Sequence, residues 1–126
     1  MTEKPTVVVI DDQDYVNMTI KIALSNWFAI HSFTSVESVT AYLETNPTVH
    51  GFIVDYHISI ESGLLLAKNT IRRLYPKTPC ILVSAFYNDT IPTVDQSEIH
   101  TYFNDTLTKP FDVNVLQEKA KRLFLQ

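Results

Sequence analysis

Five residues with chemically useful side chains occur directly after, or near the end of, apolar runs: Asp11, Asp12, Asp55, Ser84 and Lys109. If three carboxylates lie a few ångströms apart, they raise one another's pKa unless a cation neutralises them. Mg²⁺ suits such a group because it takes one or two carboxylates, several waters and a phosphate oxygen. One carboxylate would then be free to attack phosphorus, while the lysine and the hydroxyl hold the phosphoryl oxygens. The set predicts phosphorylation of an aspartate.

The strands that must position these residues are indicated by runs of β-branched and apolar residues. Four runs of strand length occupy residues 6–10, 29–33, 49–54 and 80–83, and a fifth strand is expected between 102 and 108. Two of these runs are apolar without alternation, as is typical of strands covered on both faces.

Apolar residues with helical spacing lie between the expected strands. Four such stripes begin, in order, at Val16, Val36, Leu64 and Val113. The first stripe extends to Trp27, and Ser35 and Asp112 are expected N-caps of the second and fourth. A further helix is expected within residues 88–101, with Pro92 in its first turn. Strands alternating with helices predict an α/β fold, a doubly wound parallel sheet of five strands with helices on both faces.

Length and composition are typical of one globular domain, which we expect to span residues 1–126. The net charge of −4 gives no support for nucleic-acid binding. No apolar stretch approaches the length of a membrane span. The one cysteine, Cys80, lies in an apolar run and is expected to be a buried thiol in a reducing compartment. These features predict a soluble cytoplasmic protein.

The candidate residues should meet at one edge of the sheet. In an open parallel sheet, ligands bind in the crevice outside the carboxyl ends of the strands. Asp11 and Asp12 follow the first expected strand, and Asp55 follows the third. Ser84 follows the fourth, and Lys109 lies near the expected end of the fifth. Three carboxylates, a hydroxyl and an ammonium would therefore share this edge.

These residues form four short motifs: Asp11-Asp12, Asp55, Ser84-Ala85 and Lys109-Pro110-Phe111. In this order and near this spacing, they resemble the motifs of the receiver domain of two-component response regulators. Gly63, eight residues after Asp55, also stands where the family usually has glycine. The resemblance spans nearly the whole chain and implies a flavodoxin-like fold with strand order 2-1-3-4-5. It implies a signalling module of a phosphorelay rather than an enzyme, acting by changing its protein–protein interactions.

The resemblance also implies Mg²⁺ as the cofactor. Asp12 would bind the ion directly, and Asp11 mainly through water. Asp55 would supply a further oxygen, and His57 would supply a backbone carbonyl. The family thus implies a metal site made of oxygen ligands, which are the ligands that Mg²⁺ prefers.

Asp55 would accept the phosphoryl group from a phosphohistidine on a histidine kinase or a histidine phosphotransfer protein. Ser84 would hydrogen-bond the phosphoryl group, and Lys109 would form an ion pair with it. The bond between Lys109 and Pro110 would be cis. Phe86, two residues beyond Ser84, flanks the route by which water attacks the acyl phosphate in the family, so we expect it to slow self-dephosphorylation.

The sequence departs from the family pattern at two places. Where the family commonly has methionine and proline after the acceptor, this chain has Ile58 and Ser59, and loss of the proline should leave the following loop less constrained. Where the family often has the Tyr or Phe of a rotamer switch, this chain has Thr106. Tyr102 or Phe103 are candidates to replace that aromatic ring. The phosphorylation chemistry is thus expected to be intact and the output mechanism altered.

Two other functions remain open at this point. A pseudo-receiver would keep the fold and bind partners without phosphorylation, and Thr106 is compatible with that reading. A small phosphatase resembling the haloacid dehalogenase family would use the Asp-x-Asp pattern of Asp12-Gln13-Asp14 after the first strand, with Ser84 and Lys109 in two later motifs. That family needs an acidic pair on a further strand after the lysine, where only Asp112 is available.

Overall fold

A parallel sheet of five strands forms the centre of the computed structural model, which describes residues 3–85, 91 and 93–125. Its strands are β1 (Thr6–Ile10), β2 (Ala29–Phe33), β3 (Gly51–Asp55), β6 (Cys80–Ala85) and β7 (Asp105–Lys109). Their order in the sheet is β2-β1-β3-β6-β7, and every pairing is parallel. Numbered among themselves, the five strands have the expected order 2-1-3-4-5, which confirms the predicted doubly wound, flavodoxin-like sheet.

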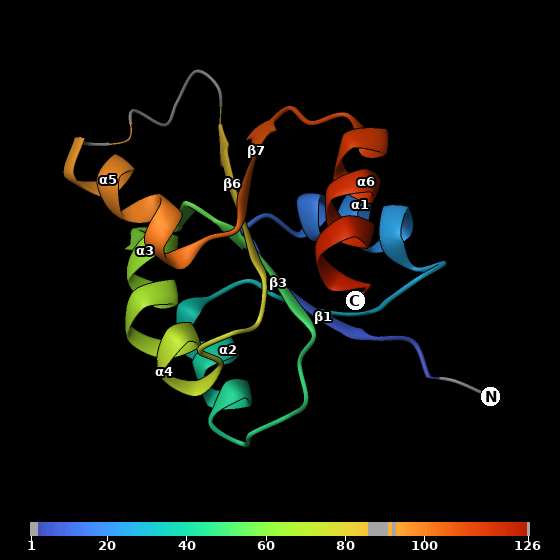
Figure 1. Cartoon of the computed structure of the whole chain (residues 1–126), viewed down its shortest axis with the longest axis horizontal. Helices are drawn as coiled ribbons and strands as arrows, with labels where there is room; N and C mark the ends of the chain where they lie inside the picture. Colours follow the sequence, from blue (N-terminus) through green and yellow to red (C-terminus); the bar gives the residue numbers. More distant parts are fainter. Residues whose placement is uncertain (1–2, 86–90, 92, 126) are drawn as a thin grey trace.

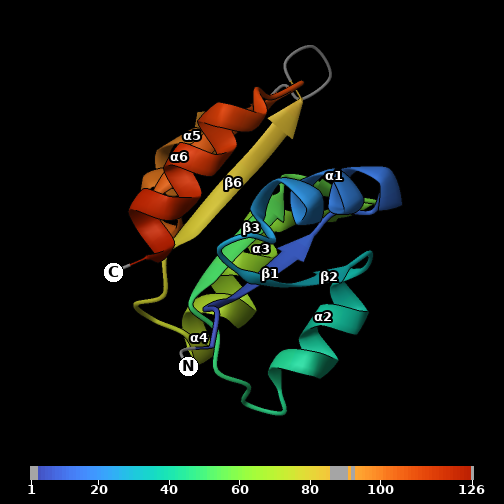
Figure 2. The same cartoon turned by 90° about the vertical axis from the view of Figure 1, so that its right-hand side faces the viewer.

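Helices cover both faces of the sheet (Figure 1). One face carries α1 (Asp14–Leu24) and α6 (Val113–Phe124). The other carries α2 (Val36–Leu43), α5 (Thr93–Tyr102) and a contiguous helical segment made of α3 (Gly63–Leu66), the π-helical η1 (Ala67–Ile71) and α4 (Arg72–Leu74). Figure 2, turned by 90°, shows α2 beside β2 at one edge of the sheet.

The apolar side chains between the sheet and its helices form two clusters, one on each face. Because consecutive residues of a strand point to opposite faces, β1 sends Val7 and Val9 into the cluster beneath α1 and α6. It sends Val8 and Ile10 into the cluster beneath α2, α3 and α5. All four side chains are at most 1% exposed. A central strand covered on both faces therefore needs apolar residues at every position, which explains its run without alternation.

Several element ends differ from the sequence expectation. Helix α1 ends at Leu24, so Trp27 lies beyond it, where the ammonium of Lys121 sits 4.4 Å from the ring centroid. Strand β6 extends two residues further than expected and includes Ser84 and Ala85. The expected N-caps are confirmed, since the side chains of Ser35 and Asp112 each accept a hydrogen bond from a main-chain amide in the first turn. Pro92 and Phe86 lie outside the described residues.

A short hairpin after β3 was not expected from the sequence. Strands β4 (His57–Ile58) and β5 (Glu61–Ser62) pair in antiparallel fashion, and Ser59 in the turn has a φ of 59°. The loss of proline at Ser59 was expected to leave this segment less constrained. In the structure this segment forms a hairpin, with Ser59 in the left-handed region at its turn.

Two features of composition have direct counterparts in the structure. Cys80 on β6 is fully buried, and burial raises the pKa of its thiol to about 12. Within the described part of the chain, we find no helix that combines the length and the apolar character needed to cross a membrane.

Candidate functional site

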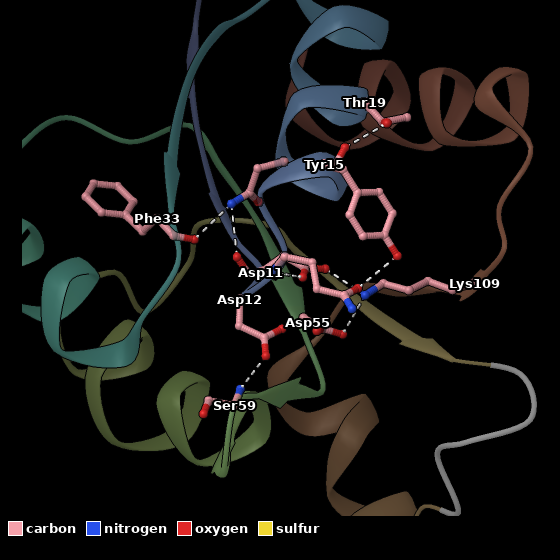
Figure 3. A network of polar contacts seen from close by, with 10 residues as sticks. Asp11, Asp12, Tyr15, Thr19, Phe33, Asp55, Ser59 and Lys109 are labelled. Atoms are coloured by element: carbon pink, nitrogen blue, oxygen red, sulfur yellow. Dashed lines mark hydrogen bonds and ion pairs between the residues drawn. The ribbon is translucent and has the colours of Figure 1, made fainter.

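Three carboxylates meet at the carboxyl edge of the sheet (Figure 3). Asp11 directly follows β1, and Asp55 is the last residue of the neighbouring strand β3. Because β1 and β3 are parallel neighbours, their ends bring these two side chains and that of Asp12 together. One carboxylate oxygen from each lies within 4.8 Å of the others. Asp11 and Asp55 are buried, at 2% and 6% exposure, whereas Asp12 is exposed.

The ammonium of Lys109 lies between two of these carboxylates. Its Nζ is 2.7 Å from Oδ2 of Asp11 and 3.3 Å from Oδ1 of Asp55. Lys109 is the last residue of β7, and the peptide bond that joins it to Pro110 is cis, as expected. Burial lowers the pKa of Lys109, but the hydrogen bond to Asp11 and the charges of Asp55 and Asp11 outweigh it, so the pKa is raised. Lys109 therefore remains a cation at this edge.

Asp55 has the most perturbed carboxyl of the site. Burial and the negative charge of Asp11 raise its pKa from 3.8 to about 7, against the opposing effect of Lys109. A carboxylate in this position is costly to ionise without further positive charge. A bound cation would remove that cost by neutralising the negative charge.

Main-chain amides orient the other two carboxylates. The amide of Gln13 donates to Oδ1 of Asp11 at 2.9 Å, and the amide of Ser59 donates to Oδ2 of Asp12 at 3.0 Å. Ser59 belongs to the hairpin turn, so the β4–β5 hairpin is attached to the acidic cluster through this bond (Figure 3). Each donor fixes one oxygen of a carboxylate and thereby limits how its side chain can turn.

Asn17 of α1 holds the main chain at this edge through hydrogen bonds, and it was not among the residues predicted from the sequence. Its side chain is 4% exposed, and its Nδ2 donates to the carbonyls of Asp11 and Phe33 at 3.0 and 3.2 Å. The amide thus joins the ends of β1 and β2 to α1. A signal was present in the sequence, because Asn17 lies at helical spacing from Ile20 and Leu24 and so shares their buried face.

Gly63 lies directly against the main chain of Asp55. A Cβ at Gly63 would overlap the carbonyl oxygen of Asp55, so no larger residue fits there without a shift of the backbone. The amide of Gly63 also donates to the carbonyl of Tyr56 at 2.8 Å. The φ of Gly63 is not positive, so its backbone conformation does not demand glycine. Glycine is required because the carbonyl of Asp55 lies where a Cβ would be.

A cavity of about 650 Å³ opens above the carboxylates. Asp12, Asp55, His57 and Lys109 line its polar part. The remaining wall comes from α1 and from the segment after β7, and it includes Tyr15, Val16, Thr19, Phe111 and Val113. The cavity therefore combines charged groups at its base with an open, partly apolar mouth.

The structure brings most of the expected site residues to this cavity. Asp11, Asp12, Asp55 and Lys109 are in one polar network, and His57 lines the same cavity. Ser84 is partly buried on β6, one residue before Ala85, and its register partner on β7 is Thr108. At the position of the expected aromatic switch, Thr106 is exposed, whereas Phe103 is buried and Tyr102 is partly buried.

The donor set fits a hard divalent cation. Three carboxylates with oxygens within 4.8 Å of one another supply the oxygen ligands and negative charge that Mg²⁺ requires. Asp12 is exposed at the cavity, so water can complete the coordination of an ion there. The three side chains of this described cluster offer carboxylate oxygens, the ligand type that suits hard divalent cations such as Mg²⁺, Ca²⁺ and Mn²⁺.

The sequence matches a known protein family over most of its length. Residues 7–121 match the family model described as the response regulator receiver domain. A search of curated proteins finds no match.

Several solved structures share the fold. The N-terminal signal receiver domain of a two-component response regulator from Bacteroides fragilis is 21% identical with a TM-score of 0.82, and the alignment covers 98% of this chain and 99% of that one. The receiver domain of response regulator 1452 from Francisella is 23% identical with a TM-score of 0.79, covering 97% and 98%. Chemotaxis protein CheY4 of Vibrio cholerae is 17% identical with a TM-score of 0.81, covering 96% and 99%. At these identities the likeness shows the fold.

Proposed function

Because this chain belongs to the family of response regulator receiver domains, we propose that it is a signalling module that accepts a phosphoryl group on Asp55. The donor would be a phosphohistidine on a histidine kinase or a histidine phosphotransfer protein. Phosphorylation would change the protein–protein interactions of the domain and so pass the signal on. The chain would act as one receiver unit over residues 1–126, in the cytoplasm and without direct contacts to nucleic acid or membrane.

The position of the Asp55 carboxylate is the observation that carries this proposal. It lies at the base of an open cavity, 3.3 Å from the ammonium of Lys109 and within 4.8 Å of the oxygens of Asp11 and Asp12. A phosphoryl donor can reach it from the cavity mouth. The surrounding charges suit an anionic group that is held by a cation on one side and a lysine on the other.

The proposed chemistry is nucleophilic attack by a carboxylate. An oxygen of Asp55 forms a bond to phosphorus while the P–N bond of the phosphohistidine breaks. The electron pair of that bond stays on the imidazole nitrogen, which takes up a proton. Lys109 forms an ion pair with the phosphoryl oxygens, and the hydroxyl of Ser84 donates a hydrogen bond to them.

Mg²⁺ would be held by Asp12, by Asp11 mainly through water, by Asp55 and by the backbone carbonyl of His57. When bound, the ion supplies positive charge that neutralises the carboxylates and the phosphoryl oxygens. Lys109 and the metal together would keep Asp55 ionised at neutral pH, against the burial that raises its pKa to about 7.

Intact-mass spectrometry tests the proposal directly. The protein is incubated with Mg²⁺ and acetyl phosphate beside Asp55→Asn and, as a matched control, Asp14→Asn, which removes an aspartate of the first turn of α1. We expect one added phosphate on the parent and on Asp14→Asn, and none on Asp55→Asn.

Absence of an adduct on the parent would be followed by ¹⁹F NMR with Mg²⁺ and beryllofluoride, which binds acceptor carboxylates as a phosphoryl mimic. Beryllofluoride bound to the parent but not to Asp55→Asn would keep Asp55 as the acceptor with a different donor. No binding to either protein would refute phosphorylation and favour a pseudo-receiver that binds its partners without it.

A further inference from the structure

Tyr56, directly after the acceptor, connects the site to α5. Asp55 points to Asp11 and Lys109, whereas the Tyr56 side chain is 4% exposed in the apolar cluster beneath α2, α3 and α5. Its hydroxyl donates a hydrogen bond of 2.6 Å to Oδ2 of Asp95 on α5. We propose that the Tyr56–Asp95 hydrogen bond carries the phosphorylation state of Asp55 to α5, and that phosphorylation weakens it. This inference rests on the proposed function of Asp55.

The main chain of Tyr56 is firmly attached to the site. Its amide donates to the carbonyl of Val83 at 2.7 Å, and its carbonyl accepts from Gly63 at 2.8 Å. Val83 directly precedes Ser84, the proposed partner of the phosphoryl group. A shift of the end of β6 toward a phosphoryl group on Asp55 would therefore be passed to the backbone of Tyr56 through this hydrogen bond.

Helix α5 is held differently at its two ends. At its C-terminal end, the guanidinium of Arg72 donates two hydrogen bonds to the carbonyl of Tyr102, at 3.2 and 2.8 Å, and Ile99 is buried beneath the helix. In its first turn, Asp95 accepts the hydrogen bond from Tyr56. A change at Asp95 can thus loosen the first turn while Arg72 keeps the far end in place.

The geometry of this hydrogen bond makes it sensitive to small movements. A separation of 2.6 Å is at the short end of the range for O–H···O hydrogen bonds, so displacement in most directions lengthens and weakens it. The phenol ring itself is confined by the apolar cluster and by the ring of His57, whose centroid lies 4.7 Å away. Movement of the backbone is therefore transmitted to the hydroxyl rather than absorbed by rotation of the ring.

This route fits a chain in which the usual aromatic position is occupied by threonine. Thr106 on β7 is exposed and has no ring that could move into the core. Tyr56, in contrast, is an aromatic residue next to the acceptor with a polar contact to the helix that faces it. The altered output expected from the sequence thus has a structural candidate in Tyr56, directly after β3.

Amide hydrogen exchange of peptides from α5 tests the inference. The full chain is measured with and without Mg²⁺ and beryllofluoride, for the parent, Tyr56→Phe and Tyr75→Phe. The last is the matched control, because the hydroxyl of Tyr75 donates to the carbonyl of Pro47, away from α5. In the parent and the control, we expect loading to speed exchange in α5 by about threefold or more. In Tyr56→Phe, exchange should already be fast without loading and should not rise further.

The outcomes separate this inference from the function on which it rests. Loss of the ¹⁹F signal of bound beryllofluoride from the parent would remove the proposed function and this inference with it. A bound adduct without faster exchange in α5, or an equal rise in Tyr56→Phe, would overturn the inference alone. If Tyr56→Phe does not fold, Asp95→Ala breaks the same hydrogen bond from the side of α5 and carries the same expectations.

Discussion

The main-chain amide of Ser59 donates a hydrogen bond of 3.0 Å to Oδ2 of Asp12. Proline, the residue common at this position in the family, has no amide hydrogen to donate and cannot adopt the φ of 59° seen here. The replacement of proline by serine therefore does more than remove a constraint. It allows the hairpin after β3 to close onto Asp12, a residue of the proposed metal site.

We expect Ser59→Pro to weaken Mg²⁺ binding, because Asp12 would lose the donor that orients its carboxylate. A hydrogen bond to an exposed carboxylate contributes about 1 kcal/mol, which corresponds to about a fivefold loss of affinity. NMR titration with MgCl₂ measures the change. Ser59→Gly is the matched control, since glycine keeps the amide and adopts a positive φ without strain, and its affinity should stay near that of the parent. Equal affinities for Ser59→Pro and Ser59→Gly would contradict this role.

Asp55→Asn should stabilise the protein when Mg²⁺ is absent. At pH 8 the Asp55 carboxyl is ionised, and burial and the charge of Asp11 make that charge unfavourable. We expect the Tm of Asp55→Asn to exceed that of the parent by about 3 °C, which corresponds to about 1 kcal/mol for a domain of this size. Glu61→Gln, which removes an exposed acid on β5, is the control and should leave Tm nearly unchanged.

Mg²⁺ should narrow this difference in Tm. A ligand that binds the folded state raises its stability, so Mg²⁺ should raise the Tm of the parent more than that of Asp55→Asn, which has lost one ligand. Thermal unfolding followed by circular dichroism in EDTA and in excess MgCl₂ gives both comparisons. An equal Mg²⁺ response in the two proteins would show that Asp55 does not contribute to the metal site.

The sheet and the acidic edge could be predicted because they follow from local patterns and one rule of topology. Apolar runs of strand length gave the strands, and the parallel order placed Asp11, Asp55 and Lys109 at the same edge although the first and last are 98 residues apart in the chain. The meeting of these residues required no knowledge of side-chain packing. It required only that the carboxyl ends of the parallel strands lie at the same edge of the sheet.

The features that escaped prediction depend on single contacts between distant groups. The hydrogen bond from Ser59 to Asp12 is donated by a main-chain amide, which every residue except proline has. It also depends on a positive φ at Ser59, which a serine in the sequence does not predict. The pairing of Tyr56 with Asp95 joins residues 39 positions apart whose side chains have no periodic relationship. Asn17 shared a helical face with apolar residues, but its partners are main-chain carbonyls, which the sequence cannot distinguish.

The two glycines of the chain should differ in their tolerance of alanine. In Gly63→Ala the new Cβ would meet the carbonyl oxygen of Asp55, which is part of the sheet backbone and cannot move freely. In Gly51→Ala it would meet the ring of Phe124, which is a side chain at the end of α6 rather than main chain of the sheet. We expect Gly63→Ala to lower the free energy of unfolding by about 2–3 kcal/mol, and Gly51→Ala to lower it by less.

Urea unfolding measures this difference, and phosphorylation by acetyl phosphate gives a second comparison. Displacement of the Asp55 carbonyl would also move the acceptor, so Gly63→Ala should incorporate phosphate more slowly than the parent under conditions where both are folded. Gly51→Ala lies at the opposite end of β3 and should react at the rate of the parent. A larger loss of stability in Gly51→Ala would contradict the account of Gly63.

Asp105 of β7 should make the stability of the protein depend on pH. Its carboxylate lies 2.9 Å from Nζ of Lys119 and 2.7 Å from Nη2 of Arg122, both on α6. Burial raises the pKa of Asp105, but the hydrogen bonds from Lys119, the Thr106 amide and Arg122 outweigh it, so the pKa lies below its ordinary value of 3.8. A carboxyl with a lowered pKa in the folded state stabilises the protein above its ordinary pKa, and that contribution is lost as the pH falls through the folded-state pKa.

We therefore expect Asp105→Asn to be less stable than the parent at pH 7, by about 1 kcal/mol because the partners are partly exposed. The difference should shrink as the pH is lowered below 3.8, where Asp105 of the parent becomes protonated and the two proteins become alike. Urea unfolding at a series of pH values measures it. Glu118→Gln, on the exposed side of α6, is the control and should differ little from the parent at pH 7. A deficit in Asp105→Asn that stays constant from pH 7 to pH 3 would mean that packing, rather than the charge of Asp105, joins β7 to α6.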